Sequence, residues 1–342
     1  MPTRVLIVDD SPTMLALLRR ELDEAPDIDV VGVANSAYDA RDKIKALNPD
    51  VITLDIEMEG MSGLEFLRRV MQLRPMPVVM VSSLTSEGAN ASLTALELGA
   101  FACHDKNNLG ARKVEHAPSL VELVRSAALR ARLTCSPSTA RAERPARDYS
   151  PRPDSVIAIG VSTGGVETLI ELLGGFPADC PPTVIVQHMP PSFTTSFAAR
   201  LDRKCPPKVA EARAGAKLVR GQVYIAPGGD RHLEIAGERG QLYCRLTAGE
   251  RVNGHRPSAD RLFQSVARVA GDTALGMILT GMGCDGAAGL KGMRDRGAMT
   301  LGQDEATSIV YGMPAAALNC GAVTEQLPLR RIGQRALEWC RA

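Results

Sequence analysis

Three aspartates and a lysine in the first third of the chain each follow a short apolar run. Asp9 and Asp10 follow the first run, Asp55 follows the third and Lys106 follows the fifth. The carboxyl ends of parallel strands meet at one edge of a sheet, so we expect these groups to lie together there. Carboxylates without Cys or His suit a hard cation, which predicts Mg²⁺ held by Asp9, Asp10 and Asp55. Asp55 stands alone at a central strand end and is predicted to accept a phosphoryl group. The alternative is that each aspartate only caps a helix or turn and that the lysine is solvated.

A serine lies between glycines where a later apolar run ends. The segment reads Ile157-Ala-Ile-Gly160-Val-Ser162-Thr-Gly164-Gly165. It matches Gly-x-Ser-x-Gly, a strand-to-helix turn that projects a nucleophilic hydroxyl at a sheet edge. The same glycines could instead cradle a phosphate at the helix N-terminus, although they do not match the dinucleotide fingerprint.

A serine nucleophile requires a base, and the base requires a carboxylate that orients it. We favour His188 as the base, because it directly follows the apolar run Thr183–Gln187 and so reaches the same sheet edge as Ser162. His232 is the rival, since Asp230 is close to it in sequence. Either histidine could instead be a loop residue bonded to the backbone.

Asp285 is the predicted third partner. It lies in the glycine-rich segment after the apolar run Leu275–Thr280, and the backbone N–H groups of that segment could form an oxyanion hole. The alternative role for Asp285 is to cap the following helix. The order Ser162, His188, Asp285 differs from the Ser, Asp, His order of ordinary α/β-hydrolases, which disfavours that class of esterase.

The elements that must position these groups are apolar strands that alternate with helical patterns. Such alternation predicts an α/β protein with parallel sheets covered on both faces. The helix after Asp10 is expected to begin at Ser11-Pro12, with Ser as N-cap. The predicted strands are Arg4–Val8, Asp29–Ala34, Asp50–Leu54, Pro77–Val81 and Phe101–Cys103, then Ser155–Gly160, Thr183–Gln187, Gln222–Ala226, Leu275–Thr280 and Ala298–Leu301, with an inserted β-hairpin of His232–Ile235 and Gln241–Leu246.

A boundary between two domains is expected at residues 134–153. This segment holds no Leu, Ile, Val, Met or Phe and is rich in Pro and Arg. It cannot offset its ordering entropy by apolar burial, so we interpret it as a flexible linker. The predicted domains are therefore residues 1–133 and 154–342.

Composition narrows the class of protein. The chain has 342 residues and a formal net charge of +1, which argues against a dedicated nucleic-acid or membrane-surface binder. Its eight cysteines include no CxxC pair, so neither a zinc site nor a disulfide framework is indicated. The first apolar run is too short for a signal peptide and no run is long enough to span a membrane, which places the chain in the cytoplasm.

The first domain resembles a response-regulator receiver domain. The resemblance rests on Val5-Leu-Ile-Val-Asp-Asp-Ser, on Asp50-Val-Ile-Thr-Leu-Asp-Ile-Glu-Met and on Val78-Val-Met-Val-Ser-Ser-Leu-Thr. It implies a flavodoxin-like (βα)5 fold, phosphotransfer to Asp55 from a histidine kinase, and detection of the phosphoryl group by Ser82 and Lys106. The sequence departs from the usual receiver pattern at four positions, which are Glu59, Ser62, Cys103 and Asn107.

The second domain closely resembles the chemotaxis protein-glutamate methylesterase family, in which a receiver precedes the catalytic domain. The resemblance rests on Ile159-Gly-Val-Ser-Thr-Gly-Gly, Val186-Gln-His-Met-Pro-Pro-Ser-Phe-Thr, Gly254-His-Arg-Pro-Ser-Ala-Asp and Leu279-Thr-Gly-Met-Gly-Cys-Asp-Gly, together with Tyr224-Ile-Ala-Pro-Gly and Gln303-Asp-Glu-Ala-Thr-Ser. It implies a doubly wound, mostly parallel α/β domain that hydrolyses glutamate γ-methyl esters on chemoreceptors and deamidates selected glutamines.

The resemblance also implies a role for each site residue. Ser162 is the nucleophile, His188 the base, Asp285 its orienting partner, and the backbone N–H of Met282 stabilises the oxyanion. No cofactor is implied in the catalytic domain. In this family the unphosphorylated receiver covers the esterase site, and a monomer is the default.

Two other functions remain open from the sequence. One is a regulatory binding module in which the departures have altered phosphorylation control. The other is a generic serine hydrolase that uses Ser162 with a different base, His232 or His255.

Overall fold

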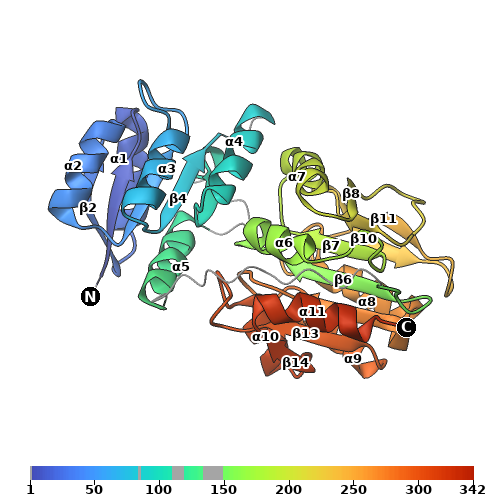
Figure 1. Ribbon diagram of the computed structural model, residues 1–342. Helices are drawn as coiled ribbons and strands as arrows, with labels where there is room; N and C mark the ends of the chain where they lie inside the picture. The colour runs from blue at the N-terminus through green and yellow to red at the C-terminus, as the bar shows by residue number, and fades with distance from the viewer. Residues whose placement is uncertain (1, 84–85, 110–118, 134–148) are drawn as a thin grey trace. The chain divides into compact units, whose positions relative to one another are not determined.

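The computed structural model describes residues 2–83, 86–109, 119–133 and 149–342. The chain divides into two compact units, Met1–Ser138 and Thr139–Ala342 (Figure 1). Each unit has its own parallel sheet with helices on both faces. The α/β class predicted from the alternating pattern is therefore confirmed for both halves.

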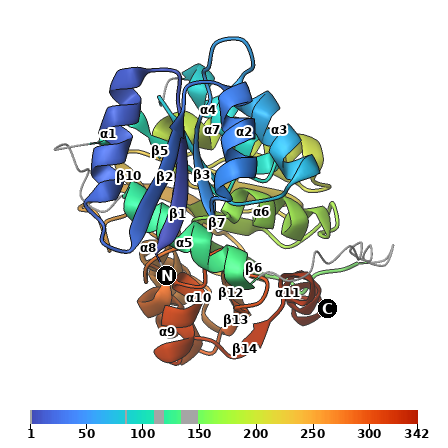
Figure 2. The ribbon, with the colours of Figure 1, turned by 90° about the vertical axis from the view of Figure 1, so that its left-hand side faces the viewer.

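The first unit contains a five-stranded parallel sheet in the order β2-β1-β3-β4-β5. Helix α1 packs against α5 and helix α3 against α4, and Figure 2 shows α1 on one side of the strands with α2 and α3 on the other. This is the flavodoxin-like (βα)5 arrangement. Its elements are β1 (Thr3–Val8), α1 (Pro12–Asp23), β2 (Ile28–Ala34), α2 (Ala37–Leu47), β3 (Val51–Asp55), α3 (Gly63–Leu73), β4 (Val78–Ser82), α4 (Ser86–Glu97), β5 (Ala102–Asp105) and α5 (Leu120–Leu133), with a 3₁₀ turn at Lys106–Asn108.

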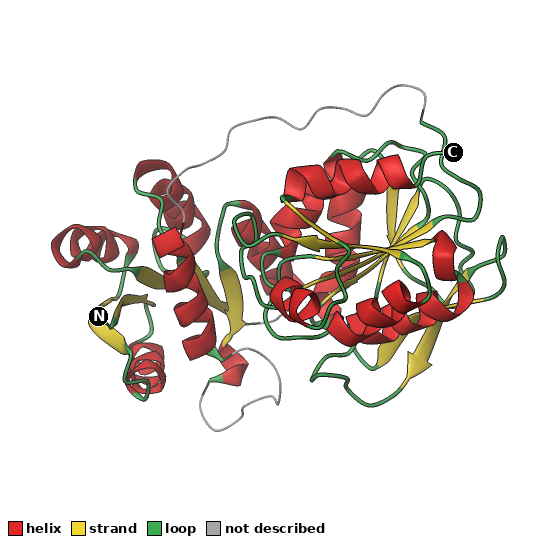
Figure 3. Cartoon of the chain, turned by 90° about the horizontal axis from the view of Figure 1, so that it is seen from below, coloured by secondary structure: helices red, strands yellow, loops and turns green. Residues whose placement is uncertain are grey.

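The second unit contains a seven-stranded parallel sheet in the order β14-β13-β12-β6-β7-β9-β8 and a separate two-stranded antiparallel sheet. Helices lie on both faces of the large sheet (Figure 3). Its elements are β6 (Val156–Val161), α6 (Gly165–Gly174), β7 (Thr183–Gln187), α7 (Pro191–Lys204), β8 (Lys208–Glu211), β9 (Gln222–Ile225), β10 (Arg231–Ala236), β11 (Tyr243–Ala248), α8 (Ala259–Val269), β12 (Ala274–Ile278), α9 (Ala287–Asp295), β13 (Met299–Gln303), α10 (Met313–Asn319), β14 (Glu325–Leu327) and α11 (Leu329–Trp339), with a 3₁₀ turn at Gly271–Thr273.

Local sequence signals account for several of these elements. Helix α1 begins as predicted, with Ser11 as N-cap, its hydroxyl accepting a hydrogen bond from the Met14 N–H, and Pro12 in the first turn. The inserted hairpin is confirmed as β10 and β11. The sequence prediction missed β8 and β14, two short strands at the edges of the sheet whose half-exposed residues carry no strong apolar pattern.

The predicted linker is described only at its C-terminal end, because residues 134–148 lie outside the described residues. Residues near 150 pair with the end of the chain. Arg152 N–H donates to Cys340 O at 2.6 Å and Ala342 N–H donates to Ser150 O at 2.9 Å. The Arg152 guanidinium lies 4.5 Å from the centre of the Trp339 ring. Residues 150–152 therefore already contact the second unit, a few residues before the predicted start at position 154.

No helix within the described ranges is long and apolar enough to cross a membrane. The cysteines in this part of the chain are all free thiols.

Candidate functional site

Ser162 follows directly after β6, in a turn that requires glycine. Gly164 has a φ of +81°, and a Cβ at Gly165 would lie 1.9 Å from Gln187 Oε1. Ser162 N–H donates to Thr280 O at 2.9 Å, and Ser162 O accepts from Gln187 Nε2 at 2.9 Å. The serine backbone is therefore held from both sides, by residues that follow β12 and end β7.

The strands that carry the three predicted catalytic residues are neighbours in the sheet. β6 lies between β12 and β7, so their carboxyl ends meet at one edge. The chain leaves β6 toward β7 on one side and later returns to β12 on the other. The junction of β6 and β12 is thus a topological switch point, the usual location of a binding crevice in such sheets.

His188 and Asp285 form a close polar pair. His188 Nε2 lies 2.8 Å from Asp285 Oδ2, and both side chains are buried. An ionised carboxylate only accepts hydrogen bonds, so Nε2 carries the proton and Nδ1 keeps its lone pair. His188 Nδ1 is buried and bonds to no described residue, which leaves it available for the proton of a serine hydroxyl.

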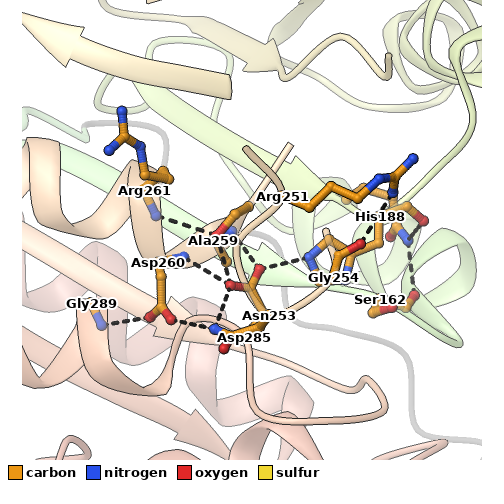
Figure 4. A network of polar contacts seen from close by, with 12 residues as sticks. Ser162, His188, Arg251, Asn253, Gly254, Ala259, Asp260, Arg261, Asp285 and Gly289 are labelled. Carbon is orange, nitrogen blue, oxygen red and sulfur yellow. Dashed lines mark hydrogen bonds and ion pairs between the residues drawn. The ribbon is translucent and has the colours of Figure 1, made fainter. Parts of the chain in front are cut away.

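The Asp285 carboxylate is held in its ionised form by several donors. Ser258 Oγ donates to Oδ1 at 2.7 Å. Ala259 N–H donates to Oδ2 at 2.7 Å, and Asn253 Nδ2 donates to Oδ1 at 3.3 Å (Figure 4). Burial alone would raise the pKa of Asp285, but the contacts with His188, Ser258 and Ala259 outweigh it and hold the pKa at about 2. A charge fixed in this way both orients an imidazole and stabilises an imidazolium.

The segment before Asp285 lies against the serine. A Cβ added to Gly281 would come within 2.8 Å of Ser162 Cβ, so only glycine fits there. The N–H of the next residue, Met282, makes no hydrogen bond to any residue in the described part of the chain. An N–H left open beside a nucleophile is what an oxyanion hole requires.

The two rival histidines occupy different positions. His232 is buried, its Nε2 is 2.8 Å from Glu250 O, and its Nδ1 accepts from the Ser258 N–H at 3.2 Å. Burial lowers its pKa. With both ring nitrogens bonded to backbone, His232 is unsuited to serve as a base. His255 lies beside His188, with the ring centres 3.7 Å apart and the planes 3° from parallel.

The predicted acidic cluster lies at the carboxyl edge of the first sheet. Asp9, Asp10 and Asp55 each bring a carboxylate oxygen within 4.8 Å of the others. Lys106 Nζ lies 2.9 Å from Asp9 Oδ2 and 2.7 Å from Asp55 Oδ2. Burial raises the pKa of Asp55, and the hydrogen bond from Lys106 offsets part of that rise. Three converging carboxylates of which two are buried fit a hard divalent cation.

The positions that depart from the receiver pattern have local partners. Ser62 caps α3, its hydroxyl accepting from the Glu65 N–H at 3.3 Å. Glu59 N–H donates to Asp10 Oδ2 at 2.9 Å, and Asn107 donates to Asp105 Oδ1 at 3.0 Å.

Ser82 and Cys103 contact the same helix. Ser82 Oγ lies 3.1 Å from Ser92 Oγ, and Cys103 Sγ lies 3.6 Å from Ser92 O. Ser92 belongs to α4 and is fully buried, so the predicted phosphoryl-sensing serine is linked to that helix.

Sequence reasoning did not find the residues that hold Asp285 and Ser162 in place. Ser258 reads from sequence as a helix N-cap, and the residue types of Asn253, Ala259 and Gln187 do not point to catalysis. The motif Gly254-His-Arg-Pro-Ser was the available signal for the Ser258 region, but only the fold shows that it reaches Asp285.

Comparison with known proteins gives matches over nearly the whole chain. The family described as CheB methylesterase matches residues 157–336, and the response regulator receiver domain matches residues 5–114. Proteins from Rhizobium etli and Agrobacterium fabrum, both named protein-glutamate methylesterase/protein-glutamine glutaminase, are 55% and 56% identical over 98% of this chain and 96% of their own. The crystal structure of the Thermotoga maritima CheB methylesterase catalytic domain is 35% identical, with a TM-score of 0.53 over 54% of this chain and 98% of that one.

Proposed function

The chain belongs to the CheB methylesterase family and carries a response regulator receiver domain ahead of the catalytic domain. From this premise we propose that it acts in the cytoplasm on methyl-accepting chemoreceptors. There it hydrolyses glutamate γ-methyl esters to release methanol, and it deamidates selected glutamines to release ammonia. Both reactions are acyl transfers to water, so one site serves both.

Ser162, His188 and Asp285 carry the chemistry. Ser162 Oγ attacks the side-chain carbonyl of the substrate while His188 Nδ1 takes the hydroxyl proton. Asp285, bonded to His188 Nε2 at 2.8 Å, stabilises the imidazolium that forms. The Met282 N–H donates to the oxyanion of the tetrahedral intermediate. His188 then protonates the departing methanol or ammonia, and water cleaves the acyl-serine by the same steps in reverse.

The observation that carries this assignment is the protonation state imposed on His188. Asp285 has its pKa at about 2 and is ionised at neutral pH, so it accepts the Nε2 proton. His188 Nδ1 is the remaining basic atom, and it is buried at the sheet edge where Ser162 follows β6. His232 lacks such an atom, because both of its ring nitrogens bond to backbone.

The receiver domain regulates this activity. A histidine kinase donates a phosphoryl group to Asp55, and Lys106 and Ser82 contact the transferred oxygens. Asp9, Asp10 and Asp55 would hold Mg²⁺, which when bound would neutralise the charge of those oxygens. Because Ser82 bonds to Ser92 in α4, its movement toward a phosphoryl group would release that helix. Phosphorylation raises the esterase activity, and the enzyme acts as a monomer.

The experiment is methanol release from methylated chemoreceptor, with and without a small-molecule phosphodonor. Ser162→Ala and His188→Gln should each lower kcat by about 10³-fold or more. His232→Gln is the matched control, a buried histidine of the same domain, and should keep kcat within about tenfold. Activity retained in His188→Gln would reject the assigned base. Asp55→Asn should keep the basal rate and lose the response to phosphodonor, and a response equal to wild type would reject the assigned acceptor.

A further inference from the structure

The His255 ring lies flat against the ring of the proposed base. The two ring centres are 3.7 Å apart and the planes differ by 3°. From this geometry we infer that His255 is a positioning residue, a flat platform that sets the ring plane of His188 for catalysis. The inference rests on the proposed role of His188.

The base needs such a platform because its hydrogen bond fixes only one ring atom. His188 Nε2 is bonded to Asp285, whereas Nδ1 bonds to no described residue. Rotation about the Cβ–Cγ bond moves Nδ1 further than Nε2, because Nε2 lies closer to the rotation axis. The atom that must meet the serine hydroxyl is therefore the atom that the Asp285 contact restrains least. A parallel ring in van der Waals contact opposes this rotation directly.

His255 is itself held by a tight turn. Val252 and His255 exchange backbone hydrogen bonds of 3.1 and 2.9 Å, and the residues between them, Asn253 and Gly254, have φ values of +49° and +79°. Positive φ at both central positions defines a type I′ turn, for which Asn-Gly is the preferred sequence. Arg251 Nη1 adds a hydrogen bond of 3.1 Å to Gly254 O.

The turn Val252–His255 also contacts Asp285, the hydrogen-bond partner of His188. Asn253 Nδ2 donates to Asp285 Oδ1 at 3.3 Å and to Asp260 Oδ2 at 2.7 Å. One four-residue turn thus contacts the carboxylate through its second residue and the imidazole through its fourth. This arrangement sets the position of the carboxylate and the plane of the imidazole from a single rigid element.

The test compares two apolar replacements that differ in flatness. His255→Phe keeps a planar ring, and His255→Leu has a similar volume without one. Leu should lower kcat by about 10- to 100-fold with KM within about threefold, the range expected when a catalytic group is misplaced by about 1 Å. Phe should keep kcat within about fivefold. The downfield proton NMR signal of His188 Nε2–H should remain in the Phe variant and broaden in the Leu variant.

Two results would overturn the inference. Wild-type kcat in His255→Leu would show that no platform is needed, and an equal loss in Phe and Leu would show that the imidazole nitrogens matter instead of the flat face. His188→Gln in the same assay separates this failure from that of the proposed function. If His188→Gln stays active, the assigned base is wrong. If it is inactive while His255→Leu is fully active, only the platform is wrong.

Discussion

Replacing Asp285 by Asn tests what the buried charge contributes, because the hydrogen bonds around it dictate how the amide must turn. Asp285 Oδ2 accepts from His188 Nε2 and from the Ala259 N–H, which cannot become an acceptor. Oδ1 accepts from Ser258 Oγ at 2.7 Å and from the Asp260 N–H at only 3.4 Å. The amide NH₂ group would therefore take the Oδ1 position, where the Ser258 hydroxyl can rotate to accept and only the longer backbone contact is lost. The new carbonyl oxygen would remain on His188. The histidine tautomer is then preserved and only the charge is lost.

The expected loss follows from that geometry. A hydrogen bond to a charged group is worth about 1.5–3 kcal/mol, and the charge matters most when His188 becomes an imidazolium. At about 1.4 kcal/mol per tenfold, loss of the charge in this buried site should lower kcat by about 10- to 100-fold with little change in KM. An enzyme in which the same change also reverses the tautomer loses about 10⁴-fold, so the smaller figure is itself informative.

The assay is methanol release from methylated chemoreceptor, with Asp260→Asn as the matched control. Asp260 is a second buried carboxylate that accepts from the Gly289 N–H at 2.6 Å and from Asn253 Nδ2 at 2.7 Å, and within the described residues its carboxylate has no hydrogen bond to His188. Asp260→Asn should therefore cost about tenfold or less in kcat. Equal losses in the two variants would mean that the buried network as a whole matters, and the charge-specific reasoning would be refuted.

Three further predictions concern other parts of the molecule. Ser258→Ala removes the 2.7 Å bond to Asp285 and should lower kcat by about 3- to 30-fold in the same assay, so an unchanged rate would contradict the role given to this donor. In Gly165→Ala the new Cβ would lie 1.9 Å from Gln187 Oε1, so the Gln187 side chain must move and its hydrogen bond to Ser162 O is lost. We expect kcat to fall about tenfold. Adding Gln187→Ala relieves the clash but also removes that hydrogen bond, so the double variant should not regain activity. Burial lowers the pKa of His104 from 6.5 to about 4. As pH falls from 6.5 to 4, the His104 imidazole therefore binds a proton in the unfolded state but stays neutral in the folded state. The free energy of unfolding should fall by about 3 kcal/mol over that window, and urea unfolding of His104→Gln should lack this component; equal pH dependence in the two proteins would argue against it.

The core strands were predictable because burial on both faces leaves continuous apolar runs. β6 and β7, for example, lie within a residue of their predicted bounds. The edge strands β8 and β14 were not predictable, since three or four residues that are half exposed have little apolar signal. Their existence depends on pairing with β9 and β13, which is a long-range property.

Site residues were predictable where their side chains are of a type that catalysis requires and the end of a strand fixes their position in the sheet. His188 directly after a strand and Asp285 after a glycine-rich segment meet these conditions. The donors to Asp285 do not, because Ser258 and Ala259 begin a helix, where serine is usually only a cap. Ser258 does cap α8, and its hydroxyl also reaches a carboxylate 27 positions away along the chain. Helix capping gives no hint of this second contact.

The pairing of residues near 150 with the end of the chain has a mechanical consequence. Pro151 bridges Arg341, and Ser150 and Arg152 bond to Ala342 and Cys340, all before β6 begins at Val156. Tension applied through the preceding segment would load these backbone bonds in shear before it reached β6. β6, which Ser162 follows directly, is thus shielded from pulling on its N-terminal side, and the serine would keep its alignment under such a load.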